Sequence, residues 1–176
     1  MDEIIRYIAK MLPCILAFIP IYLVIRIIII FKNKKIDFKR EILLLVFYCF
    51  LIGVFSQAFT SSLKFSIYNI SLKRINLIPF KIIYDTMVEL ESGNFSYLII
   101  SLLGNIGIFI PLGILIKIIW KISDMKTILY GFYISLFIET IQLFIGRNTD
   151  IDDLMLNTFG ILIGVLLVKI FDKKTV

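Results

Sequence analysis

Polar side chains recur at helical spacing inside two apolar stretches of the chain. In the first stretch, Ser135, Glu139 and Gln142 follow one another at steps of four and three residues. In the second, Asn157 lies four residues after Asp153. Such steps place side chains on one face of an α-helix. Because amide and ionisable side chains are costly inside a membrane-spanning helix, these two faces predict a functional site.

The segment between the two stretches adds a guanidinium and three carboxylates: Arg147, Asp150, Asp152 and Asp153. The planar fork of Arg147 suits a phosphate, a pyrophosphate or a carboxylate. The carboxylates, together with Glu139, could instead hold a divalent cation for metal-assisted hydrolysis or transfer on a lipid-linked phosphate. Two structural roles are equally open. One aspartate can cap the helix that follows, and Glu139 can pair with Arg147.

A third apolar stretch contributes Asn105, several glycines and Pro111, which can kink or loosen a helix. In the last stretch, Gly160 and Gly164 allow another helix to approach closely. We expect the three helices to bring their polar faces to one site that opens to the outside. As an alternative, the asparagines only join helices by hydrogen bonds. A second alternative is that the glycine face docks on a partner membrane protein.

Composition identifies the class of protein. The 176 residues are 60% apolar and 18% charged, whereas a soluble domain is about 45–50% apolar and about 25% charged. The sequence therefore predicts an all-α, polytopic membrane helix bundle that forms a single membrane domain over residues 1–176. Histidine is absent, which excludes HExxH zinc sites and Ser-His-Asp triads. No complete catalytic group can be assembled, so we expect binding rather than catalysis, with no metal and no cofactor.

Five stretches are long enough to cross a bilayer, which takes about 20 residues each. They cover residues 11–31, 42–59, 97–120, 128–145 and 154–171. Loops on one side then carry eleven lysines and arginines and loops on the other side seven. The positive-inside rule predicts an outer N-terminus and a cytoplasmic C-terminus, and this topology explains the net charge of +6 without a nucleic-acid partner. Arg26, inside the first stretch, either snorkels to the interface or faces the interior.

The long connection between the second and third stretches, residues 60–96, contains a further helical pattern. After Pro79, the apolar residues Phe80, Ile83 and Met87 recur at helical spacing, and a glycine–asparagine pair then provides a stop signal. We expect a short amphipathic helix in the outer membrane interface. A plug packed over the bundle is the alternative.

Several short blocks occur in order between residues 74 and 171 and resemble those of VanZ-like proteins. They are Asn76-Leu77-Ile78-Pro79-Phe80, the N-x-x-x-F-x-P-x-G pattern from Asn105 to Gly113, Glu139-x-x-Gln142, the R-x-x-D-x-x-D pattern from Arg147 to Asp153, and Asn157-x-x-Gly160-x-x-x-Gly164. The resemblance implies a multi-pass protein of the bacterial cell membrane that is associated with low-level resistance to teicoplanin, a glycopeptide antibiotic.

The resemblance and the polar faces together define a candidate ligand site. Arg147 is expected to take an anionic group, with Pro79 and Phe80 lining an apolar entrance. The expected ligand is a lipid-anchored glycopeptide or a polyprenyl-linked cell-envelope precursor, and membrane lipids are the expected surroundings. The full set of candidate ligand-binding residues is Asn76, Pro79, Phe80, Asn105, Glu139, Gln142, Arg147, Asp150, Asp153 and Asn157.

Overall fold

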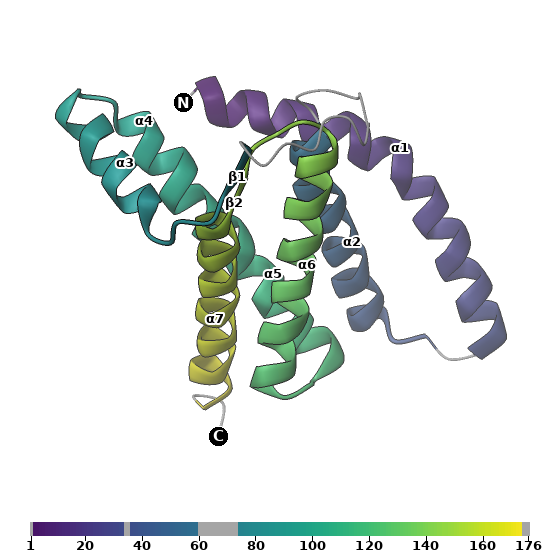
Figure 1. Ribbon diagram of the computed structural model, residues 1–176. Coiled ribbons are helices and arrows are strands. Elements are labelled where there is room, and N and C mark those ends of the chain that lie inside the picture. Colours follow the sequence, from purple (N-terminus) through teal and green to yellow (C-terminus); the bar gives the residue numbers. More distant parts are fainter. Residues whose placement is uncertain (1, 34–35, 60–73, 174–176) are drawn as a thin grey trace. The chain divides into compact units, whose positions relative to one another are not determined.

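The computed structural model describes residues 2–33, 36–59 and 74–173 (Figure 1). Residues 60–73, which include the start of the expected long connection, lie outside the described residues. The chain forms two compact units, Met1–Leu63 and Lys64–Val176. The prediction of a single membrane domain stays a prediction.

The first unit is a pair of helices, α1 (Asp2–Asn33) and α2 (Phe38–Phe59), which pack against each other. The rings of Tyr22 and Tyr48 stack between them with centroids 4.6 Å apart. Tyr48 also donates a hydrogen bond from its hydroxyl to the main-chain oxygen of Phe18 over 3.1 Å. Aromatic stacking and this hydrogen bond therefore join the two helices.

Arg26 faces α2. Its Nε donates to Oε2 of Glu41 over 2.8 Å, and its Nη2 bonds the other carboxylate oxygen. The side chains of Arg26 and Glu41 are 21% and 22% exposed. This two-point contact is the strongest form of guanidinium–carboxylate pairing. The structure thus favours the interior-facing interpretation of Arg26 over the snorkelling one.

Four helices among the described residues are long and apolar enough to cross a membrane. They are Met11–Lys32, Leu98–Trp120, Asp124–Phe144 and Ile151–Asp172. They match four of the five predicted spans. The remaining predicted span, residues 42–59, forms α2 but does not belong to this set. This span contains no charged residue, but its last residues lie outside the described side chains, so the set of four does not test it.

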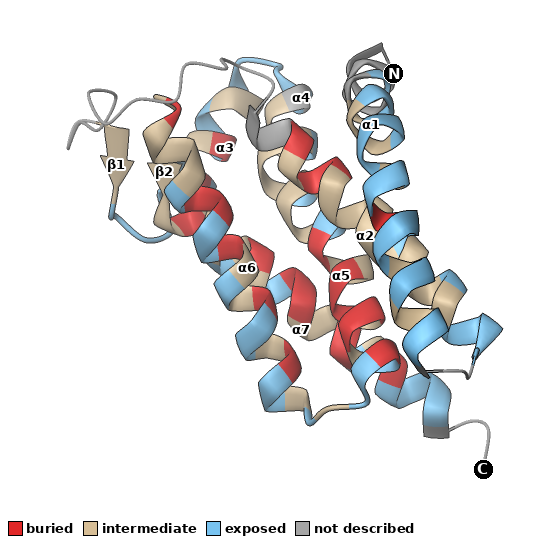
Figure 2. Ribbon diagram, turned by 90° about the vertical axis from the view of Figure 1, so that its right-hand side faces the viewer, coloured by how far each residue is buried: buried red, intermediate tan, exposed pale blue. Residues whose placement is uncertain are grey.

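The second unit is built on three long helices: α5 (Gly104–Trp120), α6 (Asp124–Phe144) and α7 (Ile151–Lys173). Buried residues gather where these helices face one another (Figure 2). The short helix α4 (Phe95–Tyr97) and a π-helical segment, η3 (Leu98–Leu103), lead into α5. The all-α membrane class is confirmed.

The close approach predicted for the glycines is made by α5 of the same chain. A Cβ atom added at Gly160 would collide with the main-chain oxygen of Ile106, and one added at Gly164 would collide with that of Ile110. The absence of side chains at these two positions therefore lets the backbones of α5 and α7 come together. The structure places α5 of the same chain on this glycine face, and a partner membrane protein stays a prediction.

The predicted short helix is present as α3 (Lys81–Glu91). Phe80 precedes it with a left-handed backbone conformation, φ 65°. The helix stops before Gly93, which has φ 84°. The amides of Ser92 and Gly93 donate to the carbonyls of Val88 and Leu90, as expected at a glycine-terminated helix end.

The apolar stripe of α3 is exposed. Phe80, Ile83 and Met87 have 60%, 45% and 59% of their surface accessible, while Ile82 and Thr86 are buried. The predicted stripe therefore does not pack on the described part of the chain. This exposure favours an interfacial helix over the alternative of a plug.

A two-residue parallel pairing was not expected from the sequence. Strand β1 (Ile75–Asn76) pairs with β2 (Thr149–Asp150), with Ile75 opposite Thr149 and Asn76 opposite Asp150. The pairing joins the segment before α3 to the connection between α6 and α7. It thereby brings the candidate residues Asn76 and Asp150, which are far apart in the sequence, to one place.

Candidate functional site

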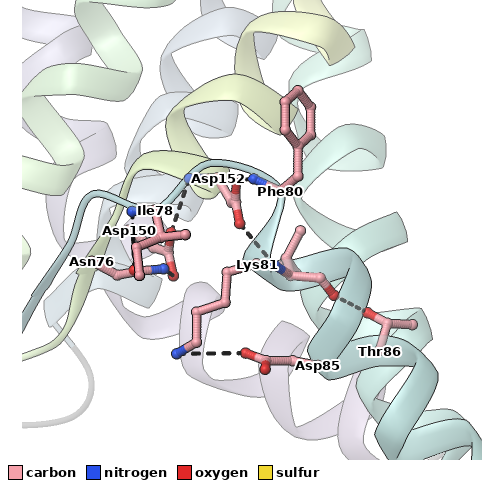
Figure 3. A network of polar contacts seen from close by, with 9 residues as sticks. Asn76, Ile78, Phe80, Lys81, Asp85, Thr86, Asp150 and Asp152 are labelled. Atoms are coloured by element: carbon pink, nitrogen blue, oxygen red, sulfur yellow. Dashed lines mark hydrogen bonds and ion pairs between the residues drawn. The ribbon is translucent and has the colours of Figure 1, made fainter.

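Asp150 stands at the centre of the β1–β2 contact (Figure 3). Asn76 donates from Nδ2 to Oδ2 of Asp150 over 2.9 Å. The other oxygen, Oδ1, accepts the amide hydrogen of Asp152 over 2.9 Å. This second bond satisfies a free N–H at the start of α7. The prediction that an aspartate caps this helix is thus confirmed for Asp150.

Asp152 caps a different helix. Its Oδ1 accepts the amide hydrogen of Phe80 over 2.5 Å, and its Oδ2 accepts that of Ile82 over 2.8 Å (Figure 3). The residue is 1% exposed. A carboxylate in this place satisfies two free N–H groups of α3 and compensates its positive dipole end. Sequence reasoning left Asp152 out of the candidate set, because its capping partners lie about 70 residues away in the chain.

A cluster of polar side chains lies between the three long helices. On the α5–α7 side, Asn105 donates from Nδ2 to Oδ1 of Asp153. On the α6–α7 side, Asn157 donates from Nδ2 to the hydroxyl of Ser135 over 2.9 Å. Ser135, Glu139 and Asn157 are 0%, 4% and 3% exposed. We call these five residues, Asn105, Ser135, Glu139, Asp153 and Asn157, the polar cluster.

Glu139 joins the polar cluster to the connection between α6 and α7. Its Oε2 accepts the amide hydrogen of Asp150 over 3.3 Å, and its main-chain oxygen accepts the hydroxyl of Thr149 over 3.1 Å. The Glu139 carboxylate also interacts electrostatically with Asp153 and with Arg147. The cluster and the Asp150 contacts therefore form one continuous site.

Arg147 lies at the edge of this site. Its amide donates to the main-chain oxygen of Gln142 over 2.9 Å, in a turn where Gly146 has φ 79°. The guanidinium acts electrostatically on both Glu139 and Asp153. Arg147 and Gln142 are half-buried. Gln142 thus contributes its main-chain carbonyl to the turn that positions Arg147.

Pro79 and Phe80 lie on the exposed side of the site. The Phe80 ring points away from the Asp152 carboxylate, while the Phe80 amide points toward it (Figure 3). The residue therefore presents an apolar surface outward and a capping donor inward. This arrangement is compatible with an apolar entrance, which stays a prediction.

Tyr97 belongs to the site although the sequence patterns did not select it. Burial raises the pKa of the Tyr97 phenol, and the carboxylates of Asp85, Asp150, Asp153 and Glu89 raise it further. Tyr97 is thus set among carboxylates from both α3 and α7. A signal was available, because Tyr97 is the aromatic first residue of the predicted span 97–120.

The placement of the carboxylates does not favour a metal centre. Among the described residues, no three histidine, cysteine, aspartate or glutamate side chains are arranged to hold one ion. Asp150 and Asp152 accept the amide hydrogens of helix starts, and Asp153 accepts the Asn105 amide. The metal-assisted alternative therefore has no ligand set to support it in this part of the chain.

Comparison with known proteins gives one match. The model of a family described as VanZ/LLP1 matches residues 21–172. The match extends over α2 and part of α1, well beyond the region from 74 to 171 whose motifs carried the resemblance. No curated protein matches the chain, and no solved structure matches it.

Proposed function

The chain belongs to the VanZ/LLP1 family, and we propose that it binds a membrane-anchored amphiphile at the polar cluster. The ligand is a lipid-anchored glycopeptide or a polyprenyl-linked precursor of the cell envelope. By binding it, the protein gives a bacterium low-level resistance to teicoplanin. The four apolar helices suit a multi-pass membrane protein.

The observation that carries this proposal is the link that Asp152 makes between α3 and α7. Through two hydrogen bonds, Asp152 fixes a helix with an exposed apolar stripe beside the polar cluster. An amphiphile needs both surfaces at once, because its chain must stay in apolar surroundings while its head group is bound by polar side chains. The Asp152 contact holds the two surfaces within one rigid arrangement.

The distribution of charge supports an outward orientation of the site. The ends of α5–α7 that lie away from the polar cluster carry Lys117, Lys121, Lys126 and Lys169. Lys117 and Lys169 both pair with Asp124 there, over 2.6 Å and 3.1 Å. By the positive-inside rule, this lysine-rich end belongs in the cytoplasm. The polar cluster and α3 then face the outside, where glycopeptides arrive.

Antibiotic susceptibility tests the proposal directly. We would express the wild-type chain, Glu139→Gln and Glu91→Gln at matched membrane levels in a glycopeptide-sensitive bacterium. Glu91→Gln is the matched control, because it removes the same charge from the exposed end of α3. We expect wild type and Glu91→Gln to protect against teicoplanin and Glu139→Gln to protect less. Equal protection against vancomycin, which lacks the acyl chain, would contradict a site for a lipid anchor.

A further inference from the structure

The α3 end of the second unit is acidic, although the chain as a whole has a net charge of +6. Among the described residues, the carboxylates here outnumber the cations. The carboxylates are Asp85, Glu89, Glu91, Glu139, Asp150, Asp152 and Asp153, and the cations are Arg74, Lys81 and Arg147. Lys81 is already paired with Asp85 on α3 (Figure 3).

The carboxylates of this end differ in the groups that they contact. Asp150 and Asp152 neutralise the positive ends of α7 and α3, because they accept helix-start amides. Glu139 and Asp153 act electrostatically on each other, and Arg147 is the cation that acts on both. Two carboxylates thus share one guanidinium in a mostly buried place. A cationic ligand would favour the charged form of both carboxylates.

Asn157 points to a missing hydrogen-bond donor in the same place. It lies one turn along α7 from Asp153, and its partner Ser135 lies one turn along α6 from Glu139. The Asn157 amide is therefore set between α6 and α7, one helical turn from Asp153 on its own helix. Its Nδ2 is used by Ser135, but its Oδ1 has no hydrogen-bond partner in the described part of the chain. A buried acceptor of this kind calls for a donor.

The acceptors of this set are carboxylate and amide oxygens. Among the described residues, no three histidine, cysteine, aspartate or glutamate side chains are arranged to hold one metal ion. An ammonium group carries three N–H donors and no acceptor, which suits a set made of acceptors alone. Tyr97 adds an aromatic ring among carboxylates from α3 and α7, and such rings attract cationic head groups.

We propose that the polar cluster recognises the protonated amine of an amphiphile whose apolar part rests on the exposed stripe of α3. Glu139 and Asp153 supply the negative charge, Oδ1 of Asn157 accepts one N–H, and Tyr97 shields the group from water. Phe80, whose ring points outward next to the Asp152 cap, begins the apolar surface. This proposal rests on the proposed amphiphile-binding function and specifies its head group.

The test compares three head groups on the unmodified full-length chain in phosphatidylcholine nanodiscs. The probes are single-chain C18 amphiphiles, spin-labelled near the chain end, with a primary ammonium, a hydroxyl or a phosphate head. Electron paramagnetic resonance measures the motionally restricted fraction of each probe and so its relative association with the protein. At neutral pH we expect the ammonium probe to associate about tenfold more strongly than the hydroxyl probe, the ratio given by one charge-assisted hydrogen bond.

Variants locate the preference. Glu139→Gln and Asp153→Asn should each bring the ammonium-to-hydroxyl ratio toward one, whereas the exposed control Glu91→Gln should leave it unchanged. Tyr97→Phe keeps the ring and should keep the ratio, while Tyr97→Leu should lower it. An unchanged ratio in both Glu139→Gln and Asp153→Asn would overturn the assignment to this cluster.

The outcomes separate the head group from the function on which it rests. If all three probes associated equally, and more strongly than bulk phosphatidylcholine, the proposed ammonium preference would be overturned. Amphiphile binding itself would remain supported. A preference for the phosphate probe would do the same and would favour Arg147 as the binding group. Association of every probe at the level of bulk phosphatidylcholine would contradict both proposals.

Discussion

Replacing Asp152 by asparagine tests the contact that fixes α3 beside the polar cluster. Asparagine keeps one acceptor oxygen but places an NH₂ group where the other oxygen accepted an amide hydrogen, from Phe80 or from Ile82. The variant thus loses one hydrogen bond to a charged group, worth about 1.5–3 kcal/mol. Because the site is 1% exposed, water does not replace the lost partner. We expect the docked state of α3 to lose about 2 kcal/mol.

Hydrogen exchange measured by mass spectrometry on the full chain in nanodiscs would report this loss. A loss of about 2 kcal/mol should speed exchange in peptides covering Lys81–Glu91 by roughly 30-fold, if these amides exchange through undocking of the helix. Peptides from α6 should keep the wild-type rate. Glu91→Gln serves as the control, because it changes an exposed carboxylate of the same helix. If Asp152→Asn exchanged α3 no faster than Glu91→Gln, the reasoning about the cap would be refuted.

Three further substitutions test the packing of the second unit. Gly164→Ala should destabilise the contact of α7 with α5 by about 1–3 kcal/mol, since the added Cβ meets main-chain atoms. Gly107→Ala should be neutral or slightly stabilising, because a Cβ at this position meets nothing within 4 Å. Thermal unfolding in detergent compares the two variants. Asn105→Leu removes the donor to Asp153 and should cost about 1–3 kcal/mol; an unchanged unfolding midpoint would show that this bond contributes little.

Local patterns in the sequence predicted the elements of this protein well. Helical spacing predicted α3, and the glycine–asparagine stop signal placed its end correctly at Gly93. The glycine pair in the last span predicted a close helix contact, which α5 makes. These predictions succeeded because helix periodicity, stop signals and small-residue packing depend on residues close together in the chain. The orientation in the membrane stays a prediction.

Contacts between residues far apart in the chain could not be predicted, because these local patterns depend only on residues close together. The capping of α3 by Asp152 and the pairing of Asn76 with Asp150 join residues 70 to 74 positions apart. The position of Asp152 at the start of α7 predicts a cap for α7. Nothing in the residue spacing reveals that its carboxylate instead contacts the start of α3. Tyr97 was missed because its surroundings come from α3 and α7 rather than from its own segment.

In the π-helical segment η3 (Leu98–Leu103), the number of residues matters more for the helix geometry than the identity of the side chains. A turn of π-helix contains more residues than a turn of α-helix. The length of η3 therefore sets the angle around the helix axis between Tyr97 before it and Asn105 after it. Each residue of an α-helix turns the chain by about 100°. Deleting one residue from Leu98–Leu103 would remove the extra residue of the π-helical turn and let the stretch close as an α-helix, whereas exchanging the exposed Ile99 or Leu103 for another apolar residue would keep its length.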